Sequence, residues 1–285
     1  MKVGLLLEGG AMRGIYTAGV LDVWMKNKLE IDTIMGVSAG ALFGMNYKSK
    51  QPGRVLRYNK KYAKDKRYMG WYSFLTTGNI MNAQFCFQEI ANQLDPVDFD
   101  TFKNSKEEFY AVLTNMQTGK AEYIKIEDLK QSMEYLRASG SMPFVSKPVV
   151  IEGKEYLDGG IADSIPIDKM MSMGFDKIMI VLTRPLGYRK TKGNEKLAKA
   201  VYKKYPQLVE AINKRYILYN QELDKVAQLE EAGKVFVLRP SKLIKIKRLE
   251  KDERVIQAMY DLGVSDANQS LTKLKHYLET QSEIL

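Results

Sequence analysis

Ser38 lies between two glycines in the segment Gly36-Val-Ser-Ala-Gly40, a spacing typical of a nucleophilic serine. A serine hydroxyl attacks an ester efficiently only when a neighbouring base accepts its proton. That base is often a histidine, but this chain of 285 residues contains one histidine, His276, near its end. The first question is therefore whether His276 or a carboxylate would accept the proton of Ser38.

Two further glycine-rich segments could take part in the same chemistry. The first, E-G-G-A-M-R-G over 8–14, follows an apolar run of strand length and could direct backbone N–H groups at an anion. The second places Asp158 before Gly159 and Gly160 within 155–167. An aspartate at this position could act as a base, but Asp-Gly also marks hairpin turns. Taken alone, the second segment predicts a turn.

The first glycine-rich segment has a competing interpretation as a dinucleotide-binding fingerprint. The pattern G-x-G-x-x-G would occupy positions 9, 11 and 14, and Glu30 lies near the spacing of a ribose-binding acid. Position 11 is alanine, however, where the backbone should approach the pyrophosphate most closely. A nucleotide-binding or non-catalytic α/β protein therefore remains the alternative at this point.

The elements that would position these segments alternate between strands and helices. Strand-like runs cover 2–8, 31–37, 108–116, 121–126 and 176–183, with a hairpin expected across Glu152-Gly153. Helical spacing covers 14–28, a helix is expected to begin near residue 39, and a short helix should end at Gly174. Such alternation predicts an α/β protein with three layers, α/β/α, around a mainly parallel central sheet. From about Asn194 the pattern is mostly helical, with one strand expected at 234–240.

In this order and context, the three segments resemble the patatin-like phospholipase family of lipid acyl hydrolases. The resemblance extends through A-S-G-S-M-P-F, Y-L-D-G-G and D-S-I-P-I, and covers roughly Lys2 to Arg184. It implies a Ser–Asp dyad without histidine, with Ser38 as nucleophile and Asp158 as base, and no metal or other cofactor. It also implies a lipid or other ester as substrate, cleaved through an acyl-enzyme.

The resemblance further assigns the residues around the dyad. The amides of Gly9, Gly10 and Ala11 would form the oxyanion hole. Five further residues would support the dyad and the oxyanion hole: Arg13, Gly36, Gly40, Gly159 and Gly160. The family commonly has Asp where this chain has Glu8, and glycine where it has Ala11. If the position of Ala11 requires positive φ, the oxyanion hole would be strained or shifted.

Composition and charge bound the remaining possibilities. One cysteine, Cys86, excludes an intrachain disulfide, and with a single histidine it makes a zinc site improbable. No apolar run approaches the roughly 20 residues of a membrane span, which predicts a cytoplasmic protein. The net charge of +10 arises between Arg184 and Arg254, with 19 Lys and Arg against 9 Asp and Glu. This region could contact an anionic membrane surface, and no nucleic-acid partner is expected.

The sequence also predicts the division of the chain into regions and the surroundings of two segments. We expect a catalytic core over 1–184 and a helix-rich basic region over 185–285 packed on the same domain. His276 lies opposite Leu271, Leu274 and Leu278 on an amphipathic helix, so we expect it to be solvated. The segment 69–75, M-G-W-Y-S-F-L, could line an acyl groove or dock at an interface, but burial of Trp71, Tyr72 and Phe74 in the core is the preferred interpretation.

Overall fold

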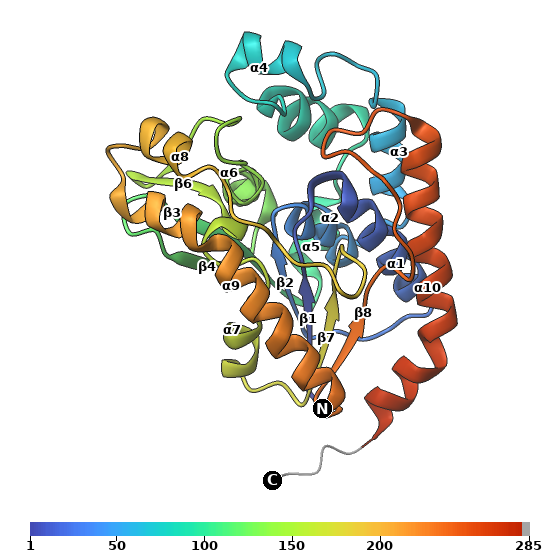
Figure 1. The fold of residues 1–285 in the computed structure, drawn as a ribbon. Helices are drawn as coiled ribbons and strands as arrows, with labels where there is room; N and C mark the ends of the chain where they lie inside the picture. Colours follow the sequence, from blue (N-terminus) through green and yellow to red (C-terminus); the bar gives the residue numbers. More distant parts are fainter. Residues whose placement is uncertain (281–285) are drawn as a thin grey trace.

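A central sheet of eight strands organises residues 1–280, which are the residues that the computed structural model describes (Figure 1). The strand order is β5-β6-β3-β2-β1-β7-β8, with β4 paired to β3. The strands are β1 (Val3–Leu7), β2 (Thr33–Val37), β3 (Glu108–Asn115), β4 (Ala121–Lys125), β5 (Val149–Ile151), β6 (Lys154–Asp158), β7 (Lys177–Val181) and β8 (Val235–Leu238).

The centre of the sheet is parallel and one edge is antiparallel. β3, β2, β1, β7 and β8 run in the same direction, whereas β4 and β6 pair antiparallel with β3. β5 and β6 form the hairpin expected across Glu152 and Gly153, both of which have positive φ. Every residue of β1, β2 and β7 is buried, as expected for parallel strands covered on both faces. The prediction of a mainly parallel α/β sheet is confirmed.

Helices cover both faces of this sheet (Figure 1). They are α1 (Ile15–Lys26), α2 (Ala39–Lys48), α3 (Arg54–Lys61), α4 (Trp71–Thr77), α5 (Phe99–Asn104), α6 (Leu129–Ser139), α7 (Ile167–Ser172), α8 (Glu195–Val201), α9 (Pro206–Glu231) and α10 (Glu253–Glu279). Short 3₁₀ segments, η1 (Ala11–Gly14) and η3 (Gly159–Ile161), follow β1 and β6, and η2 (Phe85–Leu94) is π-helical.

Alternating side chains of the strands separate two hydrophobic layers. Leu5 and Leu7 of β1 pack with residues of α1, α2, α3 and α10, whereas Leu6 packs with residues of α7 and α9. This division follows from the two-residue period of a strand, which directs successive side chains to opposite faces. The same division decides which groups approach Ser38 from each side.

The residues after 184 extend this framework. β8 adds to the sheet beside β7, and α10 packs closely along α1. The close approach depends on glycine, because a Cβ on Gly263 would lie 2.1 Å from the carbonyl oxygen of Tyr16. The predicted boundary at residues 184 and 185 stays a prediction.

The prediction that Trp71, Tyr72 and Phe74 belong to the core is wrong for Trp71 and Tyr72, whereas Phe74 is half-buried. On α4, Trp71 is 70% exposed, Tyr72 54% and Leu75 81%, although Tyr68 and Met69 just before it are buried. Figure 1 shows α4 projecting from the end of the molecule that lies furthest from the N-terminus. Within residues 1–280, no helix has the combined length and apolarity that crossing a bilayer requires.

Candidate active site

Ser38 occupies a sharp turn between β2 and α2. Its φ of 54° and ψ of −122° place a non-glycine residue in a region of backbone space that costs of order 1–3 kcal/mol. The turn brings chain segments into contact, since a Cβ on Gly40 would lie 2.3 Å from the carbonyl oxygen of Leu7. A Cβ on Gly36 would lie 2.5 Å from the Cα of Ala41, so both flanking glycines are sterically required. This is the strained strand–turn–helix arrangement of a nucleophile elbow.

Asp158 ends β6 and faces Ser38. The Ser38 hydroxyl donates a hydrogen bond to Asp158 Oδ2 over 2.6 Å, and both residues are buried, with exposed fractions of 8% and 4%. Asp158 Oδ1 accepts the N–H of Gly160 over 2.8 Å. Burial raises the pKa of Asp158, while the charge of Arg215 and these two hydrogen bonds lower it in part. The arrangement is a serine hydroxyl in contact with a carboxylate that is more basic than usual.

The glycine-rich loop after β1 lies directly against Ser38. A Cβ on Gly9 would lie 2.9 Å from Ser38 Cβ, so only glycine permits this contact. The N–H groups of Gly9, Gly10 and Ala11 donate to no other group within residues 1–280. Ala11 has a φ of 49°, so the residue that replaces the family's glycine does adopt a left-handed backbone. That conformation costs alanine roughly 1–2 kcal/mol.

A buried carboxylate holds this loop from behind. Glu8 accepts hydrogen bonds from the Thr183 N–H over 2.6 Å and from the Tyr219 hydroxyl over 2.7 Å. The Thr183 hydroxyl also donates to the carbonyl of Gly9 over 3.1 Å. Glu8, which stands where the family commonly has Asp, is therefore a structural anchor. Sequence reasoning missed Thr183 and Tyr219, because both reach the loop through packing over a long sequence separation.

A second support comes from the end of α6. Ser139 Oγ accepts the backbone N–H of Ser38 over 2.9 Å and donates to the carbonyl of Val112 over 2.8 Å. Ser139 belongs to the A-S-G-S-M-P-F segment, whose small residues were the available sequence signal. On the other side of Asp158, a Cβ on Gly159 would lie 2.0 Å from the Val112 carbonyl oxygen, so this glycine is required as well.

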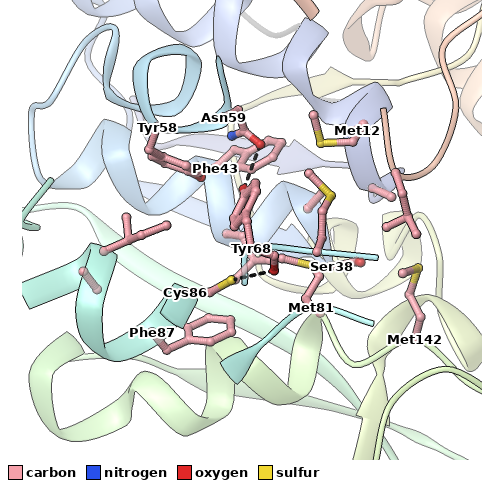
Figure 2. Close-up of a pocket in the computed structure, with 18 of the residues that line it drawn as sticks. Met12, Ser38, Phe43, Tyr58, Asn59, Tyr68, Met81, Cys86, Phe87 and Met142 are labelled. Carbon is pink, nitrogen blue, oxygen red and sulfur yellow. Dashed lines mark hydrogen bonds between the residues drawn. The ribbon is translucent and has the colours of Figure 1, made fainter. Parts of the chain in front are cut away.

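An apolar cavity opens beside Ser38 on the face covered by α2, α3 and η2. Figure 2 shows Ser38 on one side of this cavity and Tyr58 and Phe87 on the other. Two polar members of its lining are paired with each other, as the Tyr68 hydroxyl donates to Asn59 over 2.8 Å. The lining includes Met12, Leu42, Phe43, Met81, Cys86, Ile90, Met133 and Met142. This cavity fits a flexible apolar chain attached at Ser38.

Cationic side chains approach the dyad from the opposite face. The Arg215 Nη2 atom of α9 lies 3.0 Å from the position that a Cβ on Gly160 would occupy. Arg13 lies in η1, and Lys190 Nζ is 4.1 Å from the ring centroid of Tyr219. Burial lowers the pKa of all three side chains, and that of Lys190 falls to about 7. Arg215 and Lys190 were not singled out by sequence.

The fold does not bring His276 to Ser38, and it does not bring Glu30 to the glycine-rich loop. His276 is exposed in the last turn of α10, where its neighbour Tyr277 bonds to Ile178 at the start of β7. Ser38 follows the end of β2, and the two strands are both parallel to β1, so His276 lies at the other end of the sheet. Glu30 precedes β2 and is likewise at the end opposite the glycine-rich loop, which argues against a dinucleotide site.

Comparisons with known proteins assign the family. The family model described as patatin-like phospholipase matches residues 5–171, which is more than half of the chain, and the chain belongs to this family. A separate model, a domain of unknown function (DUF6363), matches residues 205–279, which include α9, β8 and α10. The site residues thus fall under two models, with Ser38 and Asp158 in the first and Arg215 and Tyr219 in the second.

Two relatives each match somewhat less than two thirds of the chain. The uncharacterized protein YjjU of Escherichia coli K12 is 30% identical over 189 residues, covering 65% of this chain and 52% of that protein. The lysophospholipase nte1 of Aspergillus niger is 30% identical over 199 residues, covering 63% of this chain and 12% of that protein. The chain therefore spans about half of the first relative and a small part of the second. The solved structure of VipD from Legionella pneumophila covers 94% of this chain and 67% of its own, with 13% identity and a TM-score of 0.42.

Proposed function

We propose that this chain is a serine hydrolase of lipid esters that works with a Ser38–Asp158 dyad. The observation that carries the proposal is the 2.6 Å hydrogen bond from the Ser38 hydroxyl to Asp158, beside three unused amides of the glycine-rich loop. Membership of the patatin-like phospholipase family supports lipid ester hydrolysis. The name of the nte1 relatives supports a lysophospholipid as one substrate class.

The first half-reaction forms an acyl-enzyme. Ser38 Oγ attacks the ester carbonyl carbon while its proton moves to Asp158 Oδ2. The oxyanion that forms accepts hydrogen bonds from the amides of Gly9, Gly10 and Ala11, and the N-terminus of α2 adds a favourable dipole. When the tetrahedral intermediate collapses, the C–O bond breaks and the alcohol leaves with the proton from Asp158. The acyl group remains on Ser38.

The second half-reaction releases the acid. A water molecule gives a proton to Asp158 and attacks the acyl carbon, and collapse returns the Asp158 proton to Ser38 Oγ. A carboxylate is a weak base at its ordinary pKa, so the raised pKa of Asp158 favours its part in both steps. The apolar cavity holds the acyl chain during the reaction.

Hydrolysis of p-nitrophenyl esters by four proteins tests this proposal. Ser38→Ala and Asp158→Asn should each lose at least about 10²–10⁴ in kcat, and His276→Ala should match the wild type. A thermal transition shows that each variant is folded. Equal loss in His276→Ala and Ser38→Ala would contradict the dyad. Stabilisation of an esterase-inactive wild type by NAD or ATP would instead favour the nucleotide-binding alternative.

We further propose that α4 carries the contact with an anionic membrane surface. Trp71, Tyr72 and Leu75 are exposed together, and one lysine lies near each end of α4. Lys251 Nζ lies 3.2 Å from the position of a Cβ on Gly70, at the start of α4. Lys147 approaches Gly78 at its end in the same way. Of these two lysines only Lys251 belongs to the basic region 184–254, so the proposed surface differs from the one expected from charge alone.

Tryptophan fluorescence tests this surface. The chain has two tryptophans, and Trp24 is fully buried, so a blue shift with vesicles reports Trp71. We expect a shift with phosphatidylglycerol vesicles, a smaller one with phosphatidylcholine vesicles, and weaker binding of Leu75→Asp. Met171→Asp on α7, which Figure 1 places away from α4, is the matched control. Equal binding of Leu75→Asp and Met171→Asp would contradict the proposal.

A further inference from the structure

Two carboxyl groups meet where α9 packs on the loop that follows Asp158. Glu222 of α9 is 7% exposed, and Asp163, in the loop after η3, is partly buried. The two side chains are hydrogen-bonded to each other. A carboxylate accepts hydrogen bonds but donates none, so a bond between two carboxyl groups requires that one of them is protonated. The pair therefore holds one proton between Asp163 and Glu222.

One oxygen of Glu222 depends on this proton. Glu222 Oε2 accepts the backbone N–H of Ile165 over 2.9 Å. Glu222 Oε1 is buried, and no N–H or hydroxyl group within residues 1–280 donates to it. An unpaired carboxylate oxygen in such a position is costly. A proton shared with Asp163 supplies the missing bond, as it does where two neighbouring carboxyl groups do not both ionise.

The groups that face the pair from β4 and α7 favour the shared proton. The Tyr123 hydroxyl of β4 donates to Asp163 Oδ2 over 2.6 Å, and burial raises the pKa of Tyr123, so this hydroxyl stays protonated. On α7, the negative charge of Asp168 raises the pKa of Asp163 further. Lys169 of α7 lies over the ring of Tyr123, and Lys225 of α9 pairs with Asp168. Neither lysine therefore neutralises the carboxyl pair.

The cation on the same helix does not neutralise the pair either. Arg215 lies two turns before Glu222 on α9, but the charge of Asp158 affects its pKa more than that of Glu222 does. Burial raises the pKa of Asp163. Burial, the charge of Asp163 and the bond between the two groups raise the pKa of Glu222 to about 9. The pair should therefore keep its proton at neutral pH and lose it at alkaline pH.

A short chain of hydrogen bonds connects Glu222 to the base of the dyad. Glu222 holds the N–H of Ile165, and the neighbouring Ser164 donates from its hydroxyl to the carbonyl of Gly160 over 2.8 Å. The N–H of Gly160 in turn donates to Asp158 Oδ1 over 2.8 Å. α9 packs on both η3 and α7, and Figure 1 shows it running beside α7. A movement of the loop away from α9 would therefore reach the hydrogen bond that orients Asp158.

We propose that Glu222 is a positioning residue for Asp158, on which it acts through a proton shared with Asp163. The inference rests on the proposed hydrolase function and adds to it a residue outside 5–171. While the proton is present, the pair holds the loop on α9 and Asp158 stays oriented towards Ser38. When the proton is lost, two negative charges face each other in a buried place, and the loop moves away. The rate should then fall at alkaline pH, although Asp158 is fully ionised there.

The pH dependence of Ser38-dependent hydrolysis of a p-nitrophenyl ester tests the inference, with the rate of Ser38→Ala subtracted at each pH. The kcat of the wild type should fall roughly tenfold between pH 8 and pH 10, as for one group titrating near 9. Glu222→Gln should match the wild type at pH 7 and stay level to pH 10, because its amide N–H replaces the shared proton and does not titrate. Asp163→Asn supplies the amide from the other side and should behave in the same way.

Glu210→Gln is the matched control, because Glu210 is an exposed glutamate of α9 that pairs with Lys214. It should show the same alkaline fall as the wild type. A fall of equal size in the wild type, Glu222→Gln and Asp163→Asn would overturn the inference and leave the hydrolase standing. A wild-type kcat that stays level to pH 10 would overturn it as well.

Thermal melts test the shared proton without a substrate. The pKa of Glu222 is raised in the folded state, so its contribution to stability is present at low pH and is lost as pH rises through the folded pKa. Glu222→Gln removes this loss, so its Tm relative to the wild type should be higher at pH 9 than at pH 5, by at least about 3 °C. An equal difference at both pH values would overturn the inference. The expected difference in a protein without esterase activity would support the carboxyl pair and contradict the hydrolase.

Discussion

The residues before Arg184 and the residues after it contribute to the site in different ways. The first part supplies Ser38, Asp158 and the glycine-rich loop, all on short turns at strand ends. The second part supplies Tyr219, Arg215 and Lys190 through the packing of α9. The comparison shows that backbone sterics position the reacting groups, while long-range packing sets the charge around them. Substitutions before Arg184 should therefore change the maximal rate. Substitutions after it should change how the rate depends on pH and on the substrate.

Gly9→Ala should produce the largest effect. The new Cβ would lie 2.9 Å from both Ser38 Cβ and the carbonyl oxygen of Val37, so the loop must move away from Ser38. Loss of one oxyanion donor costs about 10²–10³ in kcat, and we expect at least this loss on a p-nitrophenyl ester. Gly193→Ala is the matched control, because a Cβ there meets nothing within 4 Å. A folded Gly9→Ala protein with wild-type activity would show that the loop does not determine the rate.

Arg215→Gln should change the pH dependence rather than the maximal rate. The charge of Arg215 lowers the pKa of Asp158 against the larger effect of burial, so its removal raises that pKa further. Because Asp158 acts as base only when ionised, the acid limb of the pH–rate profile should move to higher pH. A neutral p-nitrophenyl ester isolates this effect from any headgroup contact. If the acid limb does not move, the charge of Arg215 does not affect the pKa of Asp158.

Asp158→Asn should stabilise the fold at neutral pH while it abolishes activity. The pKa of Asp158 is raised in the folded state, so its contribution to stability is present at low pH and is lost as pH rises through the folded pKa. The neutral amide removes that loss, and each 1 kcal/mol gained raises Tm by about 2–4 °C. Thermal melts at pH 4 and pH 8 check this, with a larger gain expected at pH 8. A gain in Tm that is larger at pH 4 than at pH 8 would contradict a raised pKa of Asp158 in the folded protein.

The sequence predicted the turns of the site because glycine spacing reflects local backbone geometry. G-V-S-A-G and E-G-G-A-M-R-G each mark a place where the chain must pass close to another segment, and the structure has close contacts at Gly9, Gly36 and Gly40. The hairpin at Glu152-Gly153 follows the same logic. The role of Asp158 came from the family resemblance alone, since an aspartate before two glycines reads equally well as a turn.

Other features could not be predicted, because they depend on contacts between distant segments. Tyr219 is 211 residues from Glu8, its hydrogen-bond partner, and no local pattern links them. Arg215 and Lys190 appeared only as part of a general positive charge. The burial of Trp71 and Tyr72 was predicted wrongly, because an aromatic side chain indicates an apolar contact without indicating whether its partner is the core or another surface.

Covalent labelling with a fluorophosphonate tests the central claim most directly. The Ser38 hydroxyl should attack phosphorus and displace fluoride, leaving one phosphonyl group on Ser38 Oγ that peptide mass spectrometry can locate. The account predicts one adduct, on Ser38, which forms much more slowly in Asp158→Asn and at an unchanged rate in His276→Ala. An adduct on another residue, or undiminished labelling of Ser38→Ala, would contradict the assignment of Ser38 as the nucleophile.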